Sequence, residues 1–187
     1  MKQQWKPGTM IYPLPAVLVS CGTWDNSNLV TVAWTGTLCT NPAMCYISLR
    51  PERHSYPIIK NHMEFTINLT TEKMAEATDW CGVRSGREYD KWAHTHLTPE
   101  RGVMVQCPHI AESPLSIECR VKEIIELGSH HMFIADVLDV LADSSLIDES
   151  TGAFRLDNAG LISYSHGQYF SQGDPIGKFG WSVKKKK

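Results

Sequence analysis

Residues 30–35 (VTVAWT) alternate bulky and small side chains, a period of two that predicts a strand with two different faces. A second strand is predicted over residues 44–49, after a turn at Asn41-Pro42. It leads into the loop Arg50-Pro-Glu-Arg-His-Ser55, where the proline ends the strand and two guanidinium groups gather beside other donors. This loop is therefore a candidate anion site.

The rest of the chain shows further strand and helix patterns. Strands are predicted at residues 16–21, 64–70, 115–127 and 132–141, with one more short strand within 160–170 and a strand-like 103–105 in an otherwise irregular stretch from 98 to 114. A helix is predicted from 54 to 62 with Ser55 as its N-cap, a second from 71 to about 80 that is broken by the glycine-containing stretch 81–87, and a helical turn from 88 to 93.

Strands in runs, with short helices between them and no βαβ alternation, predict one mainly β domain over residues 1–187, an antiparallel barrel or sandwich with α insertions. Repeated prolines predict an extended arm at residues 1–12, and the lysines at 184–187 predict a solvated tail. Neither GxGxxG nor GxxxxGK[ST] occurs, so any phosphate site does not use the Rossmann or P-loop device.

Charge and cysteine usage restrict the class of protein. Removing the four tail lysines from the formal net charge of −2 leaves −6 on the rest of the chain, an acidic balance that argues against nucleic-acid binding. The six cysteines include no CxxC pair, so reduced thiols are the simplest interpretation. Prolines interrupt any apolar run near the N-terminus, and we therefore expect a cytoplasmic protein without a membrane partner.

Candidate chemistry is concentrated in basic residues. No nucleophile–base set and no metal-ligand spacing is evident, adjacent His130 and His131 are expected to point apart, and Cys81 near a helix end gains nothing from the dipole. Arg50, Arg53, Ser55 and Lys91, with the turn at Ser85-Gly86, supply what a phosphate monoester requires, although a solvated rim is the alternative. Likewise Trp34, Tyr164, Tyr169 and Phe170 are either core aromatics or a cofactor clamp.

Several motifs occur together and in order. They are Asn28–Gly36 (NLVTVAWTG), Arg50–Ser55 (RPERHS), Asp79–Gly82 (DWCG) with Ser85–Arg87 and Asp90-Lys91, and Gly128–Val137 starting Gly-Ser-His. Over nearly the whole chain this set resembles the flavin reductase-like, FMN-binding split-barrel family, most closely its flavoredoxin branch. The resemblance implies a homodimeric six-stranded split barrel with non-covalent FMN near the dimer interface.

The resemblance also implies roles for individual residues. Ala33, Trp34, Thr35, Gly36 and Thr37 would border the isoalloxazine, and Asn28 would contact the ring or ribityl chain. The ribityl chain and phosphate would be held by Arg50, Arg53, His54, Ser55, Ser85, Gly86 and Lys91, with Cys81 lining the same pocket. His130 would lie near the flavin or nicotinamide as the candidate catalytic residue, and Tyr164 and His166, from either subunit, would cover the flavin.

The implied reaction is transfer of electrons from NADH, NADPH or another donor through FMN to a small-molecule or redox-protein acceptor, with the flavin supplying the electron chemistry. Two alternatives remain open at this point. One is an FMN-binding electron-transfer or storage module without its own NAD(P)H activity. The other is a non-flavin β-barrel protein that binds a different phosphorylated ligand through its basic loop.

Overall fold

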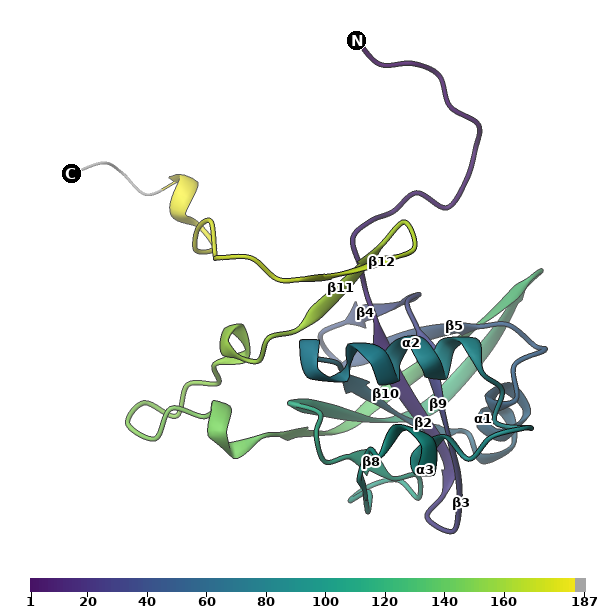
Figure 1. Ribbon diagram of the computed structural model, residues 1–187. Coiled ribbons are helices and arrows are strands. Elements are labelled where there is room, and N and C mark those ends of the chain that lie inside the picture. Colours follow the sequence, from purple (N-terminus) through teal and green to yellow (C-terminus); the bar gives the residue numbers. More distant parts are fainter. Residues whose placement is uncertain (184–187) are drawn as a thin grey trace.

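The computed structural model describes residues 1–183, and most of these fold around one curled antiparallel sheet (Figure 1). Its seven strands, in spatial order, are β3 (Asn26–Val32), β2 (Val17–Thr23), β6 (Glu64–Leu69), β9 (Leu115–Leu127), β10 (His130–Ala142), β5 (Met44–Leu49) and β4 (Thr35–Cys39). The predicted mainly β, antiparallel class is confirmed. The predicted strand number of six is wrong, since the sheet has seven.

The seventh strand comes from the segment that the alternating pattern predicted to be one strand, residues 30–35. The single strand predicted over residues 30–35 ends at Val32, and a new strand begins at Thr35, so Ala33 and Trp34 connect strands at opposite edges of the sheet. Three Cα–Cα steps reach at most ~11 Å, whereas a flat seven-stranded sheet is about 29 Å from edge to edge. The sheet must therefore curl until its edges meet, and the Trp34 carbonyl accepts a 2.8 Å hydrogen bond from the Ser48 amide.

Three short helices pack near the edge at which β3 lies (Figure 1). They are α1 (Ser55–His62), α2 (Ala75–Val83), which follows the 3₁₀ turn η1 (Glu72–Met74), and α3 (Lys91–Thr95). The predicted Ser55 N-cap is wrong, because His54 occupies that position without a side-chain cap and Ser55 is the first helical residue. The second helix ends three residues beyond its predicted end near Trp80, because α2 continues to Val83, inside the stretch 81–87 that was predicted to break it.

A smaller sheet lies apart from this body (Figure 1). It pairs β1 (Leu14–Pro15) with β11 (Ile162–Ser165) and β11 with β12 (Gln168–Ser171), where one strand was predicted. Strand is absent at 103–105, and the short pair β7 (Pro99–Glu100) and β8 (His109–Ile110) forms instead. The remaining elements are 3₁₀ turns, η2 (Ser144–Leu146), η3 (Leu156–Asn158) and η4 (Trp181–Val183). No helix within residues 1–183 has the length and apolarity needed to cross a membrane.

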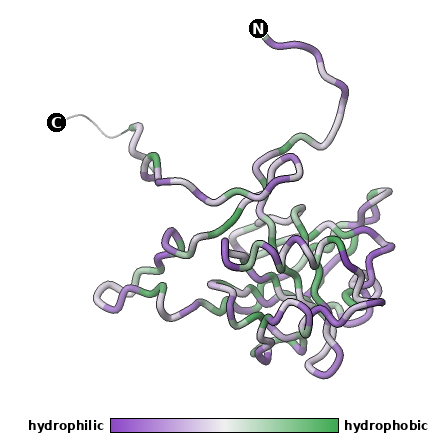
Figure 2. Tube along the Cα trace, in the orientation of Figure 1, coloured by the Kyte–Doolittle hydropathy of each residue, from purple (hydrophilic) through white to green (hydrophobic). Residues whose placement is uncertain are grey.

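The curled sheet encloses the main core. Val19, Ile47, Phe65 and Phe133 are fully buried there, and Figure 2 shows hydrophobic residues gathered in the strands of the body, with hydrophilic residues in many loops. A second cluster lies beneath α2, where Met74 and Cys81 pack with Leu18 and Leu29 from the sheet. All six cysteines are free thiols.

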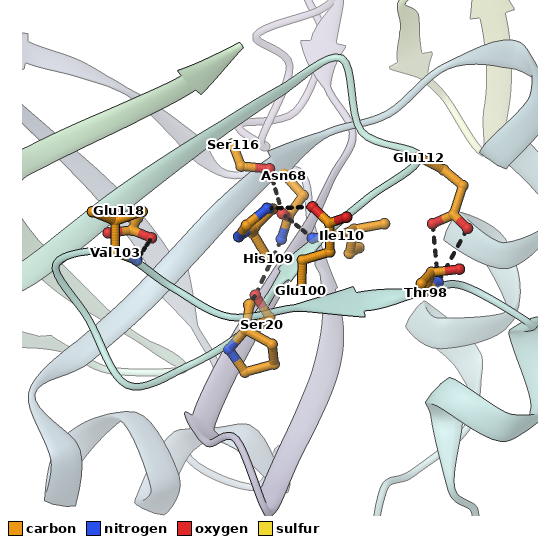
Figure 3. A network of polar contacts seen from close by, with 11 residues as sticks. Ser20, Asn68, Thr98, Glu100, Val103, His109, Ile110, Glu112, Ser116 and Glu118 are labelled. Atoms are coloured by element: carbon orange, nitrogen blue, oxygen red, sulfur yellow. Dashed lines mark hydrogen bonds and ion pairs between the residues drawn. The ribbon is translucent and has the colours of Figure 1, made fainter. Parts of the chain in front are cut away.

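Buried polar groups fix the long segment between α3 and β9 (Figure 3). The Asn68 side chain donates to the Leu18 carbonyl and accepts from the Ile110 amide and the Ser116 hydroxyl. Fully buried Glu118 accepts from the amides of Val103 and Met104 at 2.8 and 2.6 Å. These side-chain bonds satisfy backbone amides of the segment, so it keeps a fixed path although its regular structure is limited to the short β7–β8 pair.

Candidate functional site

Two connected hollows lie where the loop after β5 meets α2 and its following turn. The first, which we term the charged hollow, has a volume of about 490 Å³. Five of its lining side chains are cationic, namely Arg50, Arg53, Arg84, Arg87 and Lys91, against two carboxylates, Glu52 and Glu88. Because the chain as a whole is acidic, this local excess of positive charge makes the hollow a candidate anion site.

The back of the charged hollow is built by residues from separate elements that contact one another. Asn28 on β3 donates from Nδ2 to the hydroxyl of Ser55 on α1 at 2.7 Å, and both residues are buried. Gly86 lies against this pair, and a Cβ placed on it would collide with Asn28 Oδ1 and lie 2.8 Å from the His54 ring. A side chain at position 86 would displace Asn28 or His54, which favours glycine at this close approach.

Lys91 brings a buried charge to the same wall. The residue is only 4 % exposed, and its Nζ donates to the Cys81 carbonyl at 2.6 Å. Burial lowers the pKa of this ammonium, and the charge of Arg53 adds to the effect. An ammonium has three donors, and a buried cation is costly unless it is paired. An anion in the hollow would supply that missing partner.

Two titratable neighbours of Lys91, His54 and Cys81, favour their neutral forms in this positive environment. Burial, with the charges of Arg87 and Lys91, lowers the pKa of His54 and so favours its neutral form. Burial raises the pKa of the Cys81 thiol to about 11, so Cys81 lines the hollow as a neutral thiol.

The second hollow, termed the aromatic hollow, has a volume of about 450 Å³ and shares Arg50 and Arg53 with the first. On one wall Trp34 packs against His130, with ring centroids 4.4 Å apart. On the other lie Tyr164 and Tyr169 of the smaller sheet. Flat aromatic walls beside a charged end suit a ligand with a planar ring and an anionic tail.

Two polar groups complete the aromatic hollow. The Tyr169 hydroxyl donates to Asp79 Oδ1 at 3.2 Å, and burial together with that carboxylate raises the pKa of Tyr169 to about 12. Burial and the charge of Arg50 lower the pKa of His130. His131 instead meets the Tyr56 hydroxyl, 2.7 Å from its Nδ1, so the two adjacent histidines point apart as predicted.

Most of the residues proposed from sequence line one of the two hollows. The charged hollow contains Asn28, Arg50, Arg53, His54, Ser55, Cys81, Ser85, Gly86 and Lys91, and the aromatic hollow contains Ala33, Trp34, His130 and Tyr164. Thr35, Gly36 and Thr37 lie on β4 outside both linings, where the Thr35 hydroxyl donates to the Tyr46 carbonyl. His166 packs on Tyr12, with ring centroids 4.6 Å apart, and lines neither hollow.

Some lining residues were missed by the sequence reasoning. Arg84 and Arg87 flank Ser85-Gly86 and add two of the five cations, and their spacing around a serine–glycine turn was the available signal. Asp79 and Val83 line the aromatic hollow, and their four-residue spacing on one helix places them on the same face. Within residues 1–183 no three His, Cys, Asp or Glu side chains gather as metal ligands.

This chain is similar to known proteins in its family model, in its structure and in its sequence. A family described as "Flavin reductase like domain" matches residues 9–171. The flavoredoxin of Desulfovibrio vulgaris (Miyazaki F) is similar in structure, with a TM-score of 0.90 and 29% identity over 98% of this chain and 100% of that one. An FMN-binding protein of Thermus thermophilus has a TM-score of 0.80 and 21% identity over 95% and 99%, a likeness that shows the fold alone. An uncharacterized protein of Pyrococcus abyssi is 30% identical over 69% of this chain and 74% of its own length.

Proposed function

Since this chain belongs to the flavin reductase-like family, we propose that it binds FMN non-covalently and acts as an oxidoreductase. Electrons would pass from NADH, NADPH or another donor to a small-molecule or redox-protein acceptor. The observation that carries the proposal is buried Lys91 at the wall of a hollow lined by five cationic side chains, which continues through Arg50 and Arg53 into an aromatic hollow.

The charged hollow fits the phosphate of FMN. Lys91 offers a point charge with unused donors, and Arg53 and Arg87 offer planar guanidinium forks. Gly86 leaves room for the ligand beside the Asn28–Ser55 pair. A dianion placed here would neutralise an excess of positive charge that the chain itself leaves unbalanced.

The aromatic hollow fits the flavin ring. Trp34 and His130 form one wall and Tyr164 the other, and the lowered pKa of His130 keeps its imidazole neutral beside the two arginines. Bound FMN would supply the two-electron chemistry, so the protein needs only to bind, orient and shield it. His130 is the group best placed to offer or accept a hydrogen bond at the ring.

A homodimer is part of the proposal. Trp5, Ile11, Phe170, Phe179 and Trp181 are exposed large hydrophobic residues on the N-terminal arm, the smaller sheet and the C-terminal segment, outside the curled sheet (Figure 1). A second copy of the chain would cover such surface. Sedimentation should give twice the monomer mass of 21.0 kDa. The six free cysteines suit a reducing cytoplasm.

Fluorescence titration with FMN and with riboflavin, which lacks the phosphate, tests the cofactor assignment. FMN should bind at least about 10-fold more tightly, because charge-assisted bonds to a phosphate contribute roughly 1.5–3 kcal/mol. Equal affinities would contradict the phosphate assignment. No binding of either flavin would favour a non-flavin barrel that takes another phosphorylated ligand.

An electron-transfer module without NAD(P)H activity is the second candidate, favoured by the likeness to flavoredoxin. Anaerobic stopped-flow mixing of the FMN-loaded protein with NADH and NADPH separates the two functions. Prompt bleaching of the flavin band by either nicotinamide supports the reductase, whereas bleaching only by a strong chemical reductant supports the carrier.

A further inference from the structure

The charged hollow depends on a segment with little regular structure of its own. Residues 84–90 join α2 to α3 and bring two arginines and the Ser85-Gly86 turn to the hollow. The helix α3 that follows carries Lys91 but has only five residues, too few to be stable as an isolated helix. Contacts with the rest of the body must therefore fix where α3, and with it the Lys91 ammonium, lies.

Two contacts join α3 to the end of α2. In the first, Lys91 Nζ donates to the Cys81 carbonyl at 2.6 Å. In the second, the His94 ring stacks on the Trp80 indole, with the ring centroids 3.7 Å apart and the planes inclined by 13°. Trp80 and Cys81 are adjacent in α2. Lys91 and His94 are three residues apart in α3, which places them on one face of that helix. The stack therefore helps to set the position of the helix that presents Lys91.

A third ring joins this stack. Tyr89, directly before the N-cap of α3, meets Trp80 edge-on, with the ring centroids 5.5 Å apart and the planes at 76°. The guanidinium of Arg84, at the start of the connecting segment, lies 5.6 Å from the centroid of Tyr89. Trp80 itself packs against the core cluster beneath α2. The rings thus tie both ends of residues 84–90 to the body.

We propose that Trp80 and His94 are positioning residues for phosphate binding, which act through Lys91. This inference rests on the proposed flavin function. Both residues lie outside the linings of the charged and aromatic hollows, and His94 is exposed, so the stack gains little from burial. Without the stack α3 would have more freedom to move. Fewer molecules would then hold the Lys91 ammonium toward the phosphate, and the apparent affinity would fall with that fraction.

Fluorescence titration of the full chain and its variants with FMN and with riboflavin tests the proposal. His94→Ala removes the stack and should weaken FMN binding by about threefold to tenfold, the scale of one aromatic pair. Riboflavin affinity should stay unchanged, because riboflavin has no phosphate for Lys91 to contact. His94→Phe keeps a flat ring and should restore FMN affinity. His62→Ala, at an exposed histidine that ends α1, is the matched control and should leave both affinities unchanged.

A double variant shows whether His94 acts through Lys91. When Lys91→Ala is already present, adding His94→Ala should cause no further loss of FMN affinity, because the interaction on which both residues act is already gone. A purely structural role of the stack would give the same loss with and without Lys91, and similar losses for FMN and riboflavin.

The outcomes separate the two roles. A loss of FMN affinity alone in His94→Ala, restored by His94→Phe and absent when Lys91 is already replaced, supports the positioning role. Unchanged FMN affinity in His94→Ala, equal losses for the two flavins, no recovery in His94→Phe, or additive losses with Lys91→Ala would each overturn it and leave the FMN proposal intact. Binding of neither flavin to the unaltered chain overturns the proposed function and this inference together.

Discussion

The charged and aromatic hollows differ in how the chain holds them. Every wall of the charged hollow comes from the body, through β3, the loop after β5, α1 and the segment from α2 to α3. The aromatic hollow has one wall on the body, at Trp34 and His130, and another on the smaller sheet, at Tyr164 and Tyr169. That second wall is joined to α2 by the bond between Tyr169 and Asp79.

This difference separates two tasks. A fixed charged hollow can recognise a phosphate with strong, directional bonds from groups that a packed core positions. A wall on a peripheral hairpin can move relative to the body at little cost, since few buried contacts hold it. We therefore expect phosphate recognition to be set by the body, and access to the ring to be set by the smaller sheet.

The largest expected effect is on the free energy of unfolding. It tests whether the packed core of the body, rather than the smaller sheet, stabilises the fold around the charged hollow. Phe133 is fully buried and packs edge-on against Tyr56 of α1, at 5.3 Å between centroids. Phe133→Ala should lower the free energy of unfolding by about 3–5 kcal/mol, whereas Gln168→Ala at an exposed position of the smaller sheet should change it by no more than about 0.5 kcal/mol. Urea denaturation measures both, and similar losses would remove the distinction between body and hairpin.

The next effect concerns phosphate recognition. Lys91→Ala should weaken FMN binding by roughly 1.5–3 kcal/mol, because a buried charge-assisted bond is lost, and should leave riboflavin affinity nearly unchanged. Lys73→Ala, at an exposed position in η1, is the control and should have no effect on either flavin. Fluorescence titration measures all four constants. A parallel loss for both flavins would show that Lys91 acts on the fold rather than on the phosphate.

Arg50 borders both hollows and should show a smaller effect. Its side chain is half exposed and lies 3.6 Å from Glu52, so solvent and that carboxylate offset part of its charge. Arg50→Ala should cost about 1.5 kcal/mol in FMN affinity, the low end of the range for a charged bond. Isothermal titration calorimetry measures the FMN affinity. A larger loss of affinity in Arg50→Ala than in Lys91→Ala would contradict the expectation that Lys91 contributes more than Arg50.

A weaker effect is expected at the peripheral wall. Tyr169→Phe removes the bond to Asp79 while keeping the ring, and should weaken FMN and riboflavin equally, by about 0.5–1 kcal/mol, because a 3.2 Å bond to a solvent-exposed carboxylate contributes less than a buried charge-assisted one. Paired titrations with the two flavins provide the measurement. A loss confined to FMN would place Tyr169 in phosphate recognition and contradict the division between the hollows.

The smallest expected effect is a change in the pKa of the His54 imidazole. Because burial, Arg87 and Lys91 hold its pKa below 6.5 in the folded chain, its contribution to stability is present above pH 6.5 and is lost as pH falls through 6.5 toward the lowered pKa. A phosphate dianion in the charged hollow should raise that pKa by offsetting the two cations. NMR titration of the imidazole with and without FMN measures the shift, and an unchanged pKa would place the anion elsewhere.

The sequence predicted the charged hollow better than the aromatic one, for a physical reason. Arg50, Arg53 and Ser55 lie in one loop, and Ser85, Gly86 and Lys91 in one short segment, so local chemistry marked them as anion ligands. The join between β3 and β4 at Ala33-Trp34 depends on closure of the whole sheet, which period-two alternation does not reveal. The pairing of Asp79 with Tyr169 links positions 90 residues apart, and only the folded chain brings them together.

The absorption spectrum of the chain after reconstitution with FMN and removal of free flavin tests the central claim most directly. The account predicts a retained flavin band, shifted from that of free FMN and accompanied by quenched fluorescence, because the ring would lie beside Trp34 and Tyr164 and Lys91 would hold the phosphate. A colourless protein that leaves the fluorescence of FMN unchanged would contradict it.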